Sequence, residues 1–142
     1  MTRAQAVEFF ARHQQAWDAR DAEALANSHT LDGRIISPIF RTVEGRPAIL
    51  HSYRALFQIF PDWRYTGETV LVDGNQVAQP FTVTATHVGE FMGFPGSGRR
   101  TEFSGVRLLE LRDGLIAQER RYYDFTGLLV QLGILQGKPA RA

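Results

Sequence analysis

Most of the first 60 residues carry apolar positions with the period of an α-helix, and most of the remainder alternates like strands. One face of an N-terminal helix holds Val7, Phe10, Gln14 and Trp17, with Ala6 and His13 beside them. Asp21 is placed to cap a second short helix over residues 22–27. A third helix has Pro47 in its first turn and ends before Pro61. Its apolar face is formed by Ile49, Tyr53, Leu56, Phe57 and Phe60.

Strand patterns dominate after Pro61 and are joined by two turn signals, Asp73-Gly74 and Asp113-Gly114. The expected strands cover residues 34–37, 63–72, 76–87, 99–112 and 115–123. In the pattern over residues 76–87, Phe81, Val83, Ala85 and His87 share one face. A glycine-rich loop over 89–98 follows, and a short helix with Leu128, Leu129 and Leu132 ends at Gly133. Residues 136–142 are expected to form a loose tail.

Helices followed by a long antiparallel meander predict an α+β fold. We expect a curved antiparallel sheet wrapped around the N-terminal helices, which leaves a blind pocket between the two layers. A length of 142 residues fits one domain.

Composition and absent motifs narrow the function. The net charge is +1 with both signs spread along the chain, which disfavours a nucleic-acid partner. No segment resembles a signal peptide or a membrane span, so we expect a soluble, cytoplasmic protein with no membrane partner. The chain has no cysteine, its four histidines are far apart, and phosphate-binding glycine motifs are absent. These features predict no metal, no nucleotide or other cofactor and no covalent nucleophile.

Arg107 is the unusual residue of its strand. A two-residue turn at Asp113-Gly114 pairs residue 112 with 115, so that residue 107 pairs with 120. Arg107 then shares a face with Tyr122 and Asp124, where it could bind a carboxylate or an enolate or hold Asp124 ionised. The alternative is an arginine at the rim or at a subunit interface.

Several motifs resemble the SnoaL-like polyketide cyclases, also called ester cyclases, of the nuclear transport factor 2-like superfamily. They are T-H-V-G-E-F-M-G from Thr86, S-G-R-R from Ser97, Y-Y-D-F-T-G-L-L-V-Q-L-G from Tyr122, E-G-R-P-A-I from Glu44 and F-P-D-W from Phe60. The resemblance covers about residues 5–135. It implies a cone-shaped (cystatin-like) α+β domain, a homodimer, and in some members ring closure by intramolecular aldol condensation.

A related branch of the superfamily contains limonene-epoxide-type hydrolases. That branch relies on an Asp-Arg-Asp set, and Ala85 and His87 occupy the positions where its first-strand members are expected. A second departure from the family pattern is Arg121, which stands where an acidic residue is common. The first departure disfavours a hydrolase, and the second leaves room for a binding protein.

Asp124 and His87 are the predicted catalytic residues. The resemblance places the family's acid/base aspartate at Asp124, and a carboxyl in an apolar pocket can take and return a proton. His87 could orient Asp124, protonate an enolate or bind a carbonyl oxygen. The alternatives are structural: Asp124 as a helix cap, and His87 as an anchor of the glycine-rich loop.

The predicted substrate-binding residues are Arg107, Tyr53, Trp63, Phe57, Trp17, Phe91 and Tyr122, with Phe94 as a further wall candidate. For the aromatic residues the alternative is core packing, and residues 91–95 could form a lid or a dimer contact. The sequence thus predicts a cofactor-free enzyme with acid/base chemistry on an apolar, carbonyl-bearing small molecule. Aldol-type cyclisation or a related lyase, isomerase or hydrolase step fits. A non-catalytic hydrophobic small-molecule binding protein and a limonene-epoxide-hydrolase-like enzyme are the alternatives.

Overall fold

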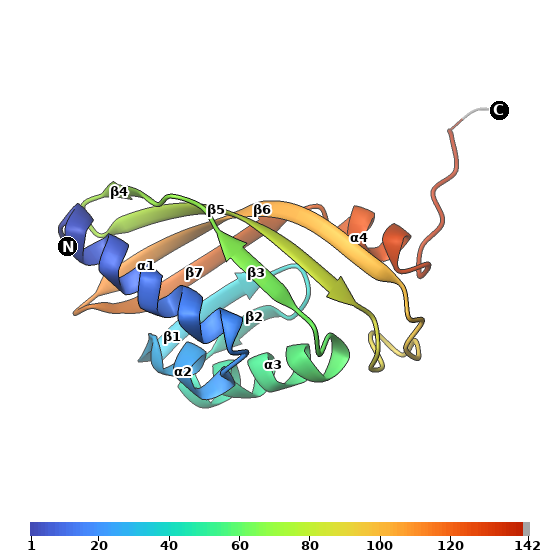
Figure 1. Ribbon diagram of the computed structural model, residues 1–142, viewed down its shortest axis with the longest axis horizontal. Coiled ribbons are helices and arrows are strands. Elements are labelled where there is room, and N and C mark those ends of the chain that lie inside the picture. Colours follow the sequence, from blue (N-terminus) through green and yellow to red (C-terminus); the bar gives the residue numbers. More distant parts are fainter. Residues whose placement is uncertain (141–142) are drawn as a thin grey trace.

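The computed structural model describes residues 1–140, which form four helices around one curved sheet of seven strands (Figure 1). The strands run in the order β2-β1-β7-β6-β5-β3, and β4 pairs with one end of β5. All pairs are antiparallel except β1 with β7. The strands are β1 (His29–Ser37), β2 (Arg41–Glu44), β3 (Arg64–Gly67), β4 (Leu71–Asp73), β5 (Gln76–Thr86), β6 (Arg100–Arg112) and β7 (Leu115–Tyr123).

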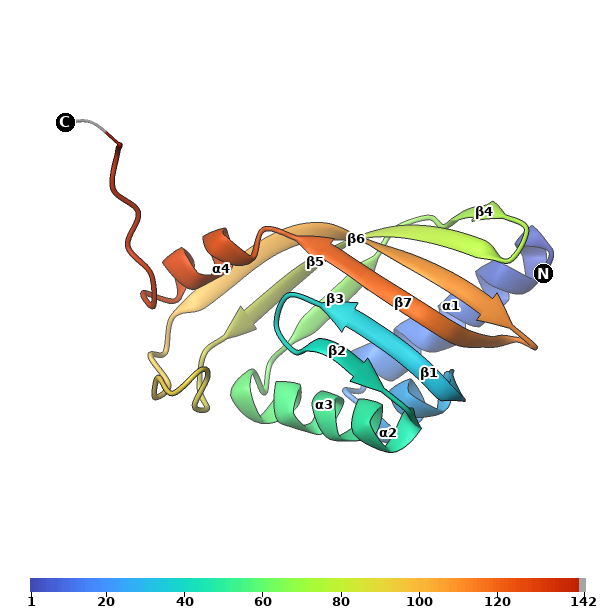
Figure 2. The same cartoon turned by 180° about the vertical axis from the view of Figure 1, so that it is seen from behind.

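Three helices lie under the concave face of the sheet. Figures 1 and 2 show the sheet arching over α1 (Arg3–Asp18), α2 (Ala22–Asn27) and α3 (Arg46–Ile59). The fourth helix, α4 (Phe125–Gln131), follows β7 directly at one end of the sheet. This arrangement confirms the predicted cone-shaped α+β fold.

The helix boundaries follow from local capping. Thr2 and Gln5 form a reciprocal capping box at the start of α1, and the Asp21 carboxylate accepts from the backbone N–H of Ala24 at 3.0 Å. The predicted apolar face of α1 is wrong at Val7, which is 48% exposed, because the buried stripe is centred on Ala6, Phe10 and His13. Phe9, which the pattern missed, completes that stripe.

The strand predicted over residues 63–72 is divided into β3 and β4. Gly67 pairs with Phe81 and Leu71 with Ala78, so the register changes between the two pairings. Pro80 of β5 lies opposite this interruption and has no N–H to donate to a neighbouring strand. The prediction for β5 itself is confirmed, since Phe81, Val83 and Ala85 are all buried on the concave face.

A β-bulge between β6 and β7 overturns the register predicted from the turn. Leu111 pairs with Ile116 as expected, but Glu110 pairs with Gln118, so one additional residue lies in β7. Arg107 is therefore opposite Arg121 rather than Arg120. The predicted face shared by Arg107, Tyr122 and Asp124 is wrong, because the added residue moves Tyr122 to the convex face, where it is 54% exposed.

The short C-terminal helix that the pattern predicted is present as α4. Asp124 is the N-cap of this helix, and Gly133 follows it with a φ of 74°, a value that favours glycine. Residues 136–140 are exposed and without regular secondary structure, and they extend away from the sheet (Figure 1). The last two residues of the predicted tail lie outside the described residues. Within residues 1–140, no helix is long and apolar enough to span a bilayer.

Candidate functional site

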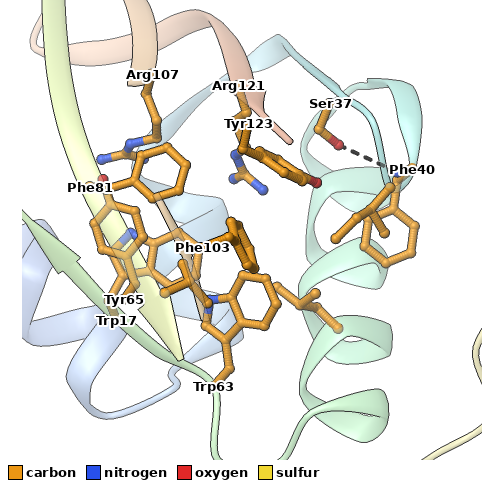
Figure 3. A pocket seen from close by; sticks show the side chains of 13 residues that line it. Trp17, Ser37, Phe40, Trp63, Tyr65, Phe81, Phe103, Arg107, Arg121 and Tyr123 are labelled. Atoms are coloured by element: carbon orange, nitrogen blue, oxygen red, sulfur yellow. Dashed lines mark hydrogen bonds between the residues drawn. The ribbon is translucent and has the colours of Figure 1, made fainter. Parts of the chain in front are cut away.

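A cavity lies between the concave face of the sheet and helices α1 and α3 (Figure 3). About 20 Å³ of it can hold the centre of a water molecule, and the whole space between its atoms, open solvent at the mouth included, is about 370 Å³. Its wall is mostly aromatic and apolar, formed by Trp17, Ile39, Phe40, Leu56, Trp63, Tyr65, Phe81, Val83, Phe103 and Tyr123. Three polar side chains complete the lining, namely Ser37, Arg107 and Arg121. Such a lining suits an apolar molecule oriented by a few polar groups.

The aromatic wall is fixed by ring-to-ring packing. Trp17 stacks on Tyr65 with a centroid separation of 4.6 Å, and Tyr65 stacks in turn on Phe81 at 5.2 Å. On the opposite side Phe103 packs against Tyr123 at 4.8 Å. The shape of the cavity therefore rests on rings that hold one another in place.

Glu119 anchors the polar side of the cavity from behind. Its Oε2 accepts from Arg121 Nε at 2.5 Å and from Arg107 Nη1 at 3.3 Å, and its Oε1 accepts from His29 Nε2 at 3.3 Å. The side chain is completely buried. Burial alone would raise the pKa of Glu119, but the charges of Arg121 and Arg107 hold it well below its ordinary value. Glu119 is therefore ionised and a poor proton acceptor.

Arg107 is held on three further groups. Its Nη2 donates to Gln79 Oε1 at 2.7 Å, and its Nη1 donates to His13 Nε2 at 3.2 Å. The guanidinium lies 4.8 Å from the centre of the Tyr65 ring. Burial, and then the charge of Arg107, hold the pKa of His13 well below its ordinary value. His13 is thus a neutral acceptor for Arg107.

Arg121 projects into the cavity with its orientation fixed (Figure 3). Nε is bound to Glu119, and Nη2 donates to the Tyr53 hydroxyl at 2.8 Å. Its guanidinium carbon lies 5.7 Å from the centre of the Trp17 ring. Burial alone would lower the pKa of Arg121, but Glu119 raises it above its ordinary value. Arg121 is therefore a permanent, aligned cation at the cavity surface.

Three buried donors in the residues that line this cavity have no hydrogen-bond partner within residues 1–140. They are Trp17 Nε1, Trp63 Nε1 and Arg107 Nε. A buried donor without a partner costs about 1–3 kcal/mol, so each is a group that a ligand could satisfy. Among the described residues, no Asp, Glu or His belongs to the cavity lining. The site is rich in donors and has no evident general base.

The structure brings together only part of the predicted site. Trp17, Trp63 and Arg107 line the cavity, and Tyr53 lies behind it as the partner of Arg121. Phe57 packs against Trp17 and Tyr53 without lining the cavity. The wall prediction for Tyr122 is wrong, for the reason given with the bulge.

The glycine-rich loop lies apart from the cavity. Phe91 is buried against Phe60, and Phe94 is 46% exposed. His87 Nδ1 accepts from the Ser97 backbone N–H at 3.3 Å and lies 3.0 Å from Ser97 Oγ. The backbone of His87 also bonds to Gly98 and Arg99. The geometry is that of a loop anchor.

Asp124 is exposed and caps α4, with its carboxylate accepting from Gly127 N at 2.8 Å. Neither Asp124 nor His87 lines the cavity. Their catalytic roles stay predictions, and the position of each fits its structural alternative.

The sequence analysis missed Glu119, Gln79 and Tyr65 and noted Arg121 only as a departure from the family pattern. A signal was present in β7, where Glu119 and Arg121 alternate on what should be an apolar face. The signal was not recognised because the predicted register lacks the bulge. Without the bulge, Glu119 and Arg121 are expected on the convex face.

The curved sheet, the helices under its concave face and the aromatic cavity between them define the class as an α+β protein with a nuclear transport factor 2-like fold. The family model described as SnoaL-like polyketide cyclase matches residues 7–132, and the chain belongs to this family. None of the curated proteins is a match.

Solved structures agree with this assignment. AclR, a candidate hydroxylase from Streptomyces galilaeus, is 26% identical with a TM-score of 0.82, over 98% of this chain and 91% of that one. IdmH, a candidate polyketide cyclase from Streptomyces antibioticus, is 27% identical with a TM-score of 0.73, over 89% and 97%. A protein from Catenulispora acidiphila with a ketosteroid isomerase-like fold is 19% identical with a TM-score of 0.75, over 93% and 98%, which shows the fold alone.

Proposed function

We propose that this protein is a cofactor-free enzyme that binds an apolar, carbonyl-bearing small molecule and promotes its enolisation. Enolisation is the step that begins an aldol-type ring closure. The observation that carries the proposal is Arg121, which Glu119 and Tyr53 hold in a fixed orientation within an aromatic cavity. A fixed cation stabilises an oxyanion without reorganising during the reaction.

The proposed chemistry balances without a cofactor. The substrate carbonyl oxygen lies against Arg121, the bond between the α-carbon and its hydrogen breaks, and the electron pair moves onto the oxygen. The proton passes to water at the cavity mouth. In ring closure the enolate carbon then forms a bond to a second carbonyl carbon, and the resulting alkoxide takes a proton from water. Activated α-protons, as between two carbonyls, suit a site whose lining has no general base.

Exchange of α-protons tests this proposal before the natural substrate is known. We expect the protein to accelerate deuterium exchange at C1 of 2-tetralone, an apolar bicyclic ketone, as followed by NMR in D2O. Arg121→Gln should reduce the acceleration roughly ten-fold or more, since it removes the charge that stabilises the enolate. Glu119 retains Arg107 and His29 in this variant, so the fold has partners for its buried carboxylate.

Arg120→Gln is the matched control. Arg120 is the adjacent residue of β7, is exposed, and faces away from the cavity. This variant should exchange 2-tetralone at the rate of the unaltered protein. Exchange no faster than in buffer alone, from a protein that binds 2-tetralone, would reject the enzymatic proposal.

A non-catalytic binding role is the second candidate. It is favoured by the same lining, in which the described residues offer donors but no carboxylate or imidazole to take a proton. Quenching of Trp17 and Trp63 fluorescence by 2-tetralone, without faster exchange, would support it.

A further inference from the structure

The polar cluster behind the cavity holds more positive charge than negative. Glu119 is its one carboxylate, and Arg107 and Arg121 are both cations bound to it. His29 is the third group that contacts Glu119. Its Nε2 lies 3.3 Å from the Glu119 carboxylate and its Nδ1 lies 3.0 Å from the Leu25 carbonyl oxygen. Both neighbours are hydrogen-bond acceptors, so His29 lies between two acceptors and supplies no negative charge to the cluster.

The other groups in the cluster do not offset this charge. His13 accepts from Arg107 and is neutral. Tyr65 donates its hydroxyl to Gln79 Oε1, and burial raises the pKa of Tyr65 to about 12, so that it remains protonated. Burial also raises the pKa of Tyr53 above its ordinary value. A buried charge without a counter-charge is costly, and a negative group inside the cavity would lower that cost.

The donors carried by the lining residues fit such a negative group. Arg121 reaches the cavity surface with Nε and Nη2 already bound, and Nη1 is its remaining nitrogen. Trp17, Trp63 and Arg107 line the same cavity (Figure 3), and each carries a buried N–H group that has no partner within residues 1–140. Indole and guanidinium nitrogens donate and do not accept, so they select an oxygen that carries lone pairs and charge.

We infer that the cavity takes its ligand as an anion, a carboxylate or an ionised acidic enol on an apolar ring system, in preference to a neutral ketone. This inference rests on the proposed function in that it concerns the same cavity. It narrows the substrate class to acids. The ionised oxygen of an acid supplies negative charge, which offsets the positive charge that Glu119 alone does not balance.

A matched pair of probes tests the inference. Benzoate and benzamide have nearly the same shape and differ in charge. We expect benzoate to raise the melting temperature and to alter tryptophan fluorescence with a Kd roughly ten-fold or more below that of benzamide. Arg121→Met should abolish the preference, and Arg120→Gln, on the convex face, should retain it. Equal Kd values for the two probes, no effect of either, or an unchanged preference in Arg121→Met would overturn the inference.

The outcome separates this inference from the proposed function. Accelerated exchange of 2-tetralone with equal binding of benzoate and benzamide would support the enzymatic proposal and reject the anion preference. A clear preference for benzoate without any exchange of 2-tetralone would support the anion preference and reject the enolisation proposal.

Discussion

Arg107 and Arg121 lie directly opposite each other on β6 and β7, and both donate to the same oxygen, Oε2 of Glu119. Like charges in such a cross-strand pair repel, and burial strengthens the repulsion. Glu119 lies two residues before Arg121 on the same face of β7, which places its carboxylate between the two guanidinium groups. The polar wall of the cavity therefore depends on one carboxylate.

Glu119→Gln should destabilise the protein by about 3–5 kcal/mol, because the change leaves two buried cations without their counter-charge. The free energy of unfolding in urea measures this directly. Glu110→Gln is the control, since Glu110 is exposed on β6, and should fall within about 0.5 kcal/mol of the unaltered protein. A similar small effect at Glu119 would contradict the role assigned to the carboxylate.

Acid should remove the same stabilisation. The folded-state pKa of Glu119 lies well below about 4.5, its ordinary value. The unfolded chain therefore binds the proton more readily, and the contribution is fully present above about pH 4.5 and lost as pH falls toward the folded pKa. Urea unfolding at successive pH values below 4.5 should show this loss. It should persist in Asp62→Asn, which removes a more exposed carboxyl whose pKa is also lowered.

His13 should make the stability of the fold depend on pH in a higher range than Glu119 does. Its folded-state pKa is well below the ordinary value of 6.5, so the unfolded chain binds this proton first. Stability is then unaffected above about pH 6.5 and falls as pH drops below it, by up to about 1.4 kcal/mol per pH unit. His13→Gln, which keeps an acceptor for Arg107, should flatten this slope. His51→Gln, at an exposed position, should leave it unchanged.

Two substitutions of Asp124 separate its role as the N-cap of α4 from a role as an acid or base. Asp124→Asn preserves an N-cap side chain and removes the acid, and it should retain both stability and 2-tetralone exchange. Asp124→Ala should cost about 1 kcal/mol of stability, because Gly127 N loses its acceptor, with exchange again retained. Loss of exchange in Asp124→Asn, with its fold intact, would instead restore Asp124 as the catalytic acid/base.

His87→Ala should loosen the loop between β5 and β6. The imidazole receives the Ser97 N–H and is buried against Phe60, so its removal leaves that loop without its side-chain anchor. Hydrogen exchange at Ser97 and Gly98 should accelerate, while exchange of 2-tetralone continues. Protection unchanged at both amides would show that the backbone bonds of His87 hold the loop without its ring.

The sequence predicted most of the elements, because their signals are local, but it missed β2 and the first half of β1. The caps at Asp21 and Asp124, the proline that ends α3 and the two Asp-Gly turns each act within a few residues. The candidate site depends on relations between distant residues. Trp17 and Trp63 were found as large aromatic side chains, and Arg107 because its charge interrupts the pattern of its strand. Glu119 and Arg121 were not found, because the register predicted from the turn turns them away from the cavity. A bulge of one residue leaves little trace in the hydrophobic pattern, and no local rule sets its position.

The bulge decides which side chains of β7 face the cavity, because successive residues of a strand point to opposite faces. Ala117 is the residue that the pairing of Glu110 with Gln118 passes over. A chain lacking one residue there would still form β7, but it would present Arg120 and Tyr122 to the cavity and turn Glu119 and Arg121 outward. Homologous chains could thus exchange one set of polar groups for another by gaining or losing a single residue, with the fold and all other side chains retained.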